Sequence, residues 1–163
     1  MSLTRRIIFG RKPRRTAVRI LALAAVAFIT FTWLLIPIRT EGISMEPTYT
    51  SGSFNLVNRL SYAIGSPARG DVVAIRLAGP SVVYVKRLVG LPGERVAFVR
   101  GAFHVNGVTV EEPYVRFRKP WDVEELTLGP DEYYAVGDNR GMSAASHSFG
   151  AVRRERILGK VLF

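Results

Sequence analysis

The sequence contains no cysteine and only two histidines among its 163 residues. The absence of cysteine excludes disulfide bonds, thiolate ligands for a metal ion and a cysteine nucleophile. One of the histidines, His104, falls in a run with the alternation of a β-strand, and we expect it on the surface. We therefore do not expect a triad of serine, histidine and aspartate, and we expect no metal ion or other cofactor.

Acidic residues are missing from the first 40 positions, which carry eight of the 23 basic side chains. The remaining 123 residues carry 15 basic and 13 acidic side chains, so that part of the chain is close to neutral. The net charge of +10 thus belongs mainly to the N-terminus. A basic tail of this kind can bind nucleic acid, but its position before an apolar segment favours a membrane surface. We expect no nucleic-acid partner.

Residues 20–38 form an uncharged apolar run, ILALAAVAFITFTWLLIPI. A helix of this length extends roughly 28 Å, close to the thickness of the hydrocarbon core of a bilayer. A cleaved signal peptide ending at 25–27 would have too short an apolar region, and a buried core helix would show a polar face. The charge distribution predicts a single pass through the cytoplasmic (inner) membrane, with a basic cytoplasmic segment at 1–19, a transmembrane anchor at 20–38 and an extracytoplasmic domain at 40–163.

After residue 40 the sequence changes to short runs of β-branched and aromatic residues, separated by glycine and proline. The Asn106-Gly107 pair is typical of a tight hairpin turn. We interpret residues 113–131, which contain three prolines and mixed charge, as an exposed excursion with partial strand character. The expected fold class is all-β, a compact and mostly antiparallel domain. The alternation of side chains predicts strands at 71–77, 81–89, 95–99, 102–105 and 132–136.

Three stretches contain residues suited to catalysis, although each also has an ordinary structural interpretation. Ser44 lies between Gly42 and Pro47, soon after the apolar run, but an isolated serine is more often a turn or cap residue. Lys86 lies in an apolar predicted strand, where desolvation would lower its pKa, but a lysine at the edge of a sheet also protects against aggregation. The third stretch, 137–150, contains three serines that equally fit a solvated loop.

Taken together and in this order, the three stretches resemble the sequence boxes of the type I signal peptidases. One such box would be weak evidence, whereas four boxes downstream of an apolar anchor are specific. The four boxes are 44–48, 69–73, 84–93 and 137–146. The resemblance extends from the anchor to the C-terminus. The similar segments are 44–48 (nucleophile box), 69–73, 84–93 (lysine box), 105–107, 112–114, 137–146 and 159–161.

The resemblance implies a membrane-bound serine endopeptidase with a Ser–Lys dyad, carried by the β-domain at 40–163. Ser44 is then the nucleophile, Lys86 is its general base, and Ser143 hydrogen-bonds the lysine amine and orients it. Asp138 and Arg140 resemble supports for the loop that carries Ser143. The family's substrates are exported preproteins, whose signal peptides are removed after small residues in an Ala-x-Ala pattern.

We expect such a substrate to pair as an extended segment with an edge strand, next to shallow pockets that admit only small side chains. Met45, Tyr84 and Val85 are the residues expected on that surface. The chain also departs from the family at the rim of the site. Ala145 and His147 stand where the family usually has Asp and Arg, and Gly42 stands where some members have a serine that donates to the oxyanion.

Two other functions fit parts of the same pattern. A dedicated maturation peptidase for a pilin or conjugation protein would share the Ser-Met-x-Pro motif and the lysine. A membrane-tethered β-domain that binds extended peptides without cutting them would share the anchor and the strands. Self-cleaving repressors also use a Ser–Lys dyad, but they lack a membrane span at the N-terminus.

Overall fold

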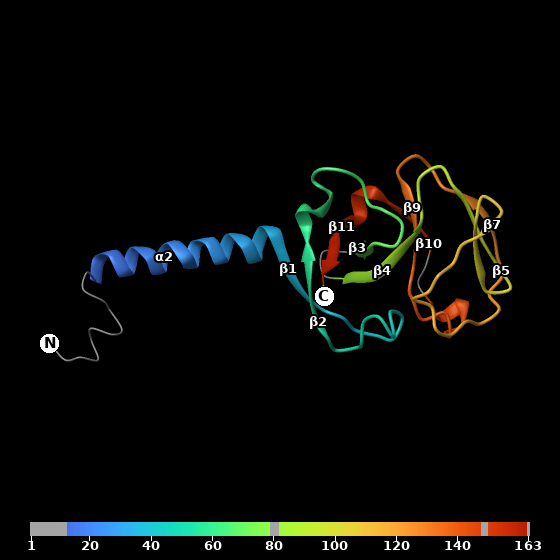
Figure 1. The fold of residues 1–163 in the computed structure, drawn as a ribbon, viewed down its shortest axis with the longest axis horizontal. Helices are drawn as coiled ribbons and strands as arrows, with labels where there is room; N and C mark the ends of the chain where they lie inside the picture. The colour runs from blue at the N-terminus through green and yellow to red at the C-terminus, as the bar shows by residue number, and fades with distance from the viewer. Residues whose placement is uncertain (1–12, 79–81, 148–149, 163) are drawn as a thin grey trace.

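The computed structural model describes residues 13–78, 82–147 and 150–162, and most of the expected basic segment lies outside this part of the chain. A single helix projects away from a β-domain (Figure 1). It comprises α2 (Pro13–Ile29), which continues as the π-helical turn η1 (Thr30–Leu34). Its large apolar side chains are exposed along its length, and the stretch Arg14–Leu34 is long and apolar enough to cross a membrane.

The helix ends earlier than the expected anchor, because residues 35–38 lie in strand β1 (Leu35–Arg39). Pro37 explains the change, since proline lacks the N–H group that a helix requires and disfavours helical geometry at the residue before it. Proline is tolerated in an edge strand. β1 is the edge of its sheet and pairs only with β2 (Phe54–Asn58) among the described strands.

The larger sheet has seven strands in the order β1-β2-β11-β3-β4-β9-β10. The last strand in the chain therefore lies near the middle of the sheet, between β2 and β3. All the described pairs of this sheet are antiparallel. Besides β1 and β2 its strands are β3 (Val72–Ala78), β4 (Val82–Gly90), β9 (Glu132–Val136), β10 (Gly150–Arg153) and β11 (Ile157–Leu162).

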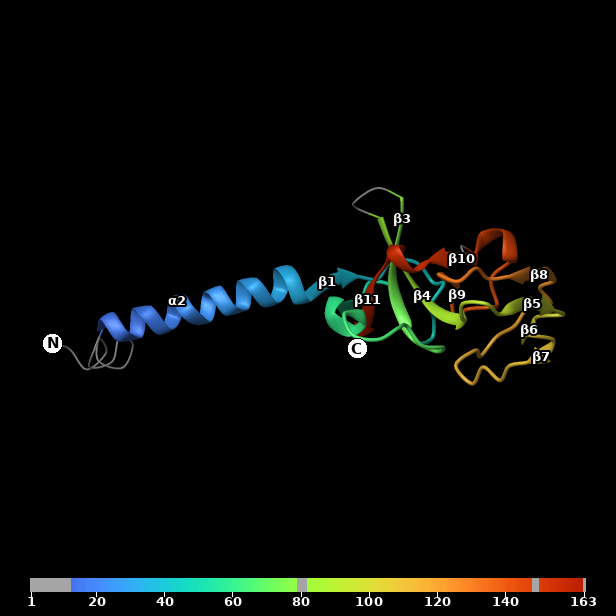
Figure 2. The same cartoon turned by 90° about the horizontal axis from the view of Figure 1, so that it is seen from above.

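The smaller sheet has four antiparallel strands in the order β7-β6-β5-β8. It lies at the end of the domain that is far from α2 in both ribbon views (Figures 1 and 2). The turn between β6 and β7 contains Asn106 and Gly107, both with positive φ (51° and 81°), as a two-residue hairpin turn requires. The strands are β5 (Arg95–Val99), β6 (Ala102–Val105), β7 (Val108–Thr109) and β8 (Val123–Thr127).

Aromatic and β-branched side chains join the two sheets into one domain. The cluster between them combines Val89 and Tyr134 of the larger sheet with Phe98 and Phe103 of the smaller sheet. A second cluster, which includes Met45, Tyr49 and Val85, lies under the segment that contains Ser44.

The expected all-β, mostly antiparallel fold is confirmed. The five predicted strands correspond to β3, β4, β5, β6 and β9, each within one residue at either end. The excursion at 113–131 contains the strand β8 in its second half.

Candidate active site

Ser44 lies in a turn that follows β1, which we call the Ser44 segment (residues 42–49). Gly42 has a φ of 87°, a conformation that suits glycine and allows the chain to reverse after the strand. Met45 is buried in the core cluster beneath the turn and fixes the segment to the domain. The side chain of Ser44 itself remains partly exposed, so its hydroxyl is accessible to a substrate.

Lys86 is only 4% exposed, and its Nζ lies 2.7 Å from Ser44 Oγ. Because it is buried, Lys86 is not a solvated lysine that guards a sheet edge, and its strand β4 lies between β3 and β9. Burial lowers the pKa of Lys86 to about 8, although the Asp138 carboxylate acts in the opposite direction. A lysine with this pKa is partly neutral near physiological pH and can then accept a proton from the serine.

Asp138 is fully buried, and its carboxylate accepts three hydrogen bonds from two residues. Arg87 donates to it from Nε (2.8 Å) and Nη2 (2.7 Å), and the Thr48 hydroxyl donates a third hydrogen bond (2.5 Å). Arg87 also donates to the Gly70 carbonyl, and its guanidinium lies 4.0 Å from the centre of the Tyr114 ring. The network ties the Ser44 segment, through Thr48, to the strand that carries Lys86.

A second buried ion pair supports the same loop. Arg140 donates two hydrogen bonds to Glu112, of 3.1 Å and 2.6 Å, and a third to the Gly137 carbonyl (2.7 Å). Its guanidinium also lies over the ring of Phe98, from the smaller sheet. Because charge-assisted bidentate pairs fix geometry strongly, this pair holds the 137–140 loop against the side of the domain that carries the smaller sheet.

Asn139 connects that loop to the backbone around Ser44. Its N–H donates to the Ser44 carbonyl, and its Nδ2 donates to the Ile43 carbonyl, both at 3.0 Å. The neighbouring Gly137 packs so closely that a Cβ built there would lie 2.1 Å from the Ser44 carbonyl oxygen. The loop therefore sets the position of the Ser44 backbone directly.

A cleft of about 540 Å³ is lined by residues that shortly precede Ser44 and Lys86 in the sequence. It is lined by residues 38–41, at the end of β1, and by Val83, Tyr84 and Val85 of β4. Within the described strands β9 pairs with β4 only from Arg87 onward, so the edge of 83–85 that faces away from β3 carries no strand. The cleft thus has an unpaired strand edge on one wall, as the expected binding of an extended peptide requires.

The structure places the remaining predicted site residues differently. Tyr84 and Val85 line the cleft, whereas Met45 is buried below it. Ser143 is exposed, and its hydroxyl donates to Ser146 Oγ at 2.8 Å, so its bond to Lys86 stays a prediction. Of the two residues that depart from the expected Asp and Arg, His147 is buried in a T-shaped contact with the Trp121 ring, 5.1 Å between centres, and Ala145 is exposed.

The sequence patterns did not predict a role for three residues that shape this site. Arg87 follows Lys86 directly. It could have been singled out because it is the only basic residue on the face of β4 opposite to Lys86. Thr48 and Glu112 lie in segments that resemble the family, but nothing local shows that they bind Asp138 and Arg140. Both contacts join residues far apart in sequence, 90 and 28 positions respectively.

Known proteins of one family match most of this chain. The model of the signal peptidase family S26 matches residues 14–163. Signal peptidase I of Bacillus caldolyticus is 40% identical over 137 residues, which cover 76% of this chain and 75% of that protein. Signal peptidase IB of Staphylococcus aureus is 30% identical over 156 residues, which cover 85% of this chain and 81% of that protein.

A crystal structure of a signal peptidase I from Enterococcus faecalis is 28% identical, covers 61% of this chain and 99% of that one, and has a TM-score of 0.47. The family match alone spans nearly all of the chain that forms the helix and the β-domain. This chain therefore belongs to the S26 family of signal peptidases and is a serine endopeptidase of the signal peptidase I type.

Proposed function

We propose that this chain is a membrane-anchored enzyme that removes signal peptides from exported preproteins, with Ser44 and Lys86 as a catalytic dyad. The observation that carries the proposal is the 2.7 Å contact between Ser44 Oγ and the buried Lys86 Nζ. The names of the related proteins support signal peptides as the substrates.

In the proposed mechanism Ser44 Oγ attacks the scissile carbonyl while neutral Lys86 takes its proton. The Ser44 N–H stabilises the negative oxygen of the tetrahedral intermediate. The Lys86 ammonium then gives its proton to the leaving amine as the C–N bond breaks, which leaves an acyl-enzyme on Ser44. Neutral Lys86 next takes a proton from a water molecule that attacks the ester, and returns it to Ser44 Oγ as the signal peptide departs.

The cleft supports the proposed substrate specificity. An extended segment before the scissile bond would pair with the open edge of β4 at 83–85. The side chains that wall the cleft include Ile38 and Val85, and large substrate side chains would collide with such walls. Small residues in an Ala-x-Ala pattern are the ones that fit this description.

The helix supports the proposed anchoring. The stretch Arg14–Leu34 contains 21 residues and would extend roughly 31 Å, enough to cross the hydrocarbon core. No residue of its most apolar stretch is buried by the part of the chain that the structure describes. Basic residues at its start, including Arg14, Arg15 and Arg19, favour a cytoplasmic N-terminus and an extracytoplasmic β-domain.

The test is cleavage of a purified preprotein by the full chain in detergent. We expect Ser44→Ala and Lys86→Ala to abolish cleavage, and Ser61→Ala and Lys160→Ala to retain it. Wild-type kcat/KM should rise with pH and level off above about 8, since only neutral Lys86 accepts the proton. Cleavage retained in either dyad variant would refute the residue assignment, and no cleavage by the wild type would refute the proposed activity.

A further inference from the structure

The loop 114–120 (YVRFRKP) packs against residues 140 and 141, next to the loop that positions Ser44, although no step of the mechanism uses it. A Cβ built on Gly141 would lie 3.2 Å from Phe117 Cβ and equally close to Asn139 Oδ1. Asn139 in turn is bonded to the carbonyls of Ile43 and Ser44. Gly141 and Asn139 therefore connect this loop to the backbone of the serine.

The loop is held in place at both ends. At its start the Val115 N–H donates to the Glu112 carbonyl at 3.1 Å. Nearer its end the Lys119 N–H donates to the Arg140 carbonyl at 3.0 Å, and the Arg118 side chain donates to the Glu112 carbonyl. At its C-terminal end Trp121 is buried and donates from Nε1 to the Met142 carbonyl at 2.9 Å. A loop fixed in this way offers a pre-organised surface, which lowers the entropy cost of binding.

The side chains at 116–119 of this loop are basic and apolar, and they are exposed to solvent. Phe117 is 70% exposed, and Arg116, Arg118 and Lys119 are exposed beside it. Among the described residues, none of these three cations forms an ion pair with a carboxylate. The surface thus combines an uncovered aromatic ring with three cations that lack an acidic partner.

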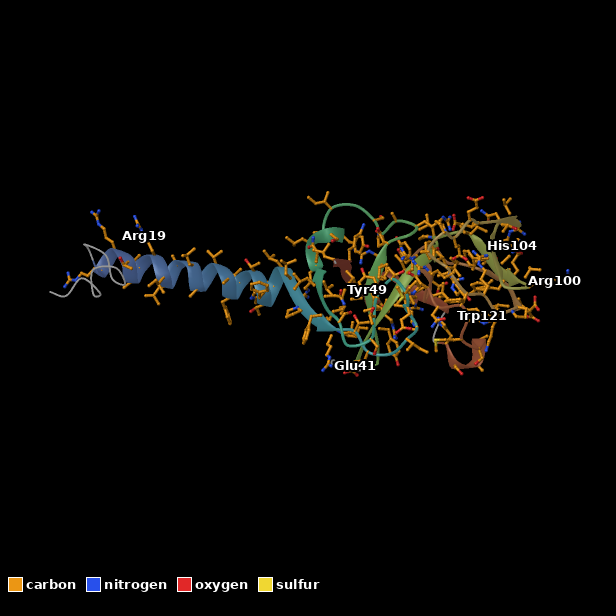
Figure 3. The ribbon with its side chains drawn as sticks, turned by 60° about the horizontal axis from the view of Figure 1, so that its bottom comes forward. Arg19, Glu41, Tyr49, Arg100, His104 and Trp121 are labelled. Carbon is orange, nitrogen blue, oxygen red and sulfur yellow. The ribbon has the colours of Figure 1, made fainter. Side chains whose placement is uncertain are left out.

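The arrangement of the domain indicates what passes over this surface. The cleft is lined by residues that follow the membrane helix, so the segment before the scissile bond lies on the anchor side. In Figure 3 Glu41, at the cleft, lies on the half of the domain nearer α2, and Trp121, at the end of the loop, lies on the farther half. A substrate that enters the cleft on the side of the helix would then leave the scissile bond toward the loop.

We propose that residues 116–119 of this loop bind the first residues of the mature protein, which follow the scissile bond. The positive charge of the loop then favours substrates with acidic side chains at these first mature positions. The proposal rests on the proposed function, since it assigns the other half of the same substrate. Exposed ion pairs are individually weak, so the selection adjusts rates and does not exclude substrates. The Phe117 ring would contribute apolar contact to any sequence.

The experiment uses the full chain in detergent and three preproteins that differ only at the second and third mature residues: Asp-Asp, Ala-Ala or Lys-Lys. We expect wild-type kcat/KM to fall in that order, about threefold at each step, which is the size of an exposed charge interaction. The double variant Arg116→Glu/Lys119→Glu should reverse the order. The control Arg153→Glu, which changes an exposed arginine on β10, should keep it. Phe117→Ala should raise KM for all three substrates alike.

An unchanged ratio between the Asp-Asp and Lys-Lys substrates in the double variant would overturn the proposal, provided that circular dichroism shows the wild-type fold. Binding of the same preproteins to Ser44→Ala gives a second readout that does not depend on cleavage, with the same order expected in Kd. Complete absence of cleavage by the wild type would refute the proposed activity, whereas equal Kd values for the three preproteins would refute the role of the loop.

Discussion

Replacing Lys86 with methionine removes the buried amine and should therefore make the protein more stable at neutral pH. The reason is that the folded state buries this ammonium next to Ser44 without a carboxylate bonded to it among the described contacts. Methionine has a similar length and carries no charge, so the same space is filled without the cost of desolvation.

The magnitude follows from the pKa of Lys86, which burial lowers from 10.5 to about 8. The difference of about 2.5 corresponds to roughly 3.4 kcal/mol. Below pH 8 the lysine is charged in both the folded and the unfolded states, so the folded state bears the full cost. Between pH 8 and 10.5 the folded protein releases the proton while the unfolded chain keeps it, so the cost disappears as pH rises. The lost bond to Ser44 costs about 1 kcal/mol, which leaves a net gain of about 2 kcal/mol at pH 7.

The assay is urea denaturation of the full chain in detergent, followed by the fluorescence of the buried Trp121 at pH 7 and at pH 10.5. The matched control is Lys160→Met. The Lys160 side chain is 44% exposed and lies 2.6 Å from the Asp71 carboxylate, so its removal should bring no gain in stability. If Lys86→Met is no more stable than wild type at pH 7, or if its advantage is the same at both pH values, the reasoning about a buried ammonium is refuted.

Two further substitutions test the loop that supports the site. Asp138→Asn leaves the Arg87 guanidinium without its buried counter-charge and should reduce the free energy of unfolding by about 3–5 kcal/mol, measured by urea denaturation; a loss below about 1 kcal/mol would contradict this. Gly137→Ala places a Cβ 2.1 Å from the Ser44 carbonyl oxygen, so the serine must move and kcat should fall at least about tenfold. Gly141→Ala, whose Cβ would meet nothing closer than 3.2 Å, is the matched control, and equal kcat values in the two variants would show that the contact does not position Ser44.

Local patterns in the sequence predicted the strands well, because alternation of β-branched residues is a local signal. The end of the helix was harder to predict, since a continuous apolar run fits both a membrane helix and a buried strand. Residues 35–38 belong to such a run, yet they form β1 because they can pair with β2. Pro37 was the one local sign of that change.

The same holds for the site: residues in local motifs could be predicted, whereas features that depend on contacts between distant residues could not. The serine and the lysine could be selected from their motifs, and the structure brings them together across 42 positions. The open edge at 83–85 could not be predicted, because it depends on where β9 begins to pair with β4. The ion pair between Glu112 and Arg140 was also out of reach, since each residue alone looks like an ordinary surface charge.

The helix and the first strand of the β-domain are joined without a linker, because β1 begins at the residue that follows η1. β1 is in turn bonded to β2 through five consecutive register pairs, so no flexible segment separates the helix from the β-domain. A spanning helix that is longer than the local hydrocarbon core tilts to fit it. With the anchoring proposed above, that tilt would turn the cleft relative to the membrane plane, so the thickness of the bilayer would affect where along a substrate the enzyme cuts.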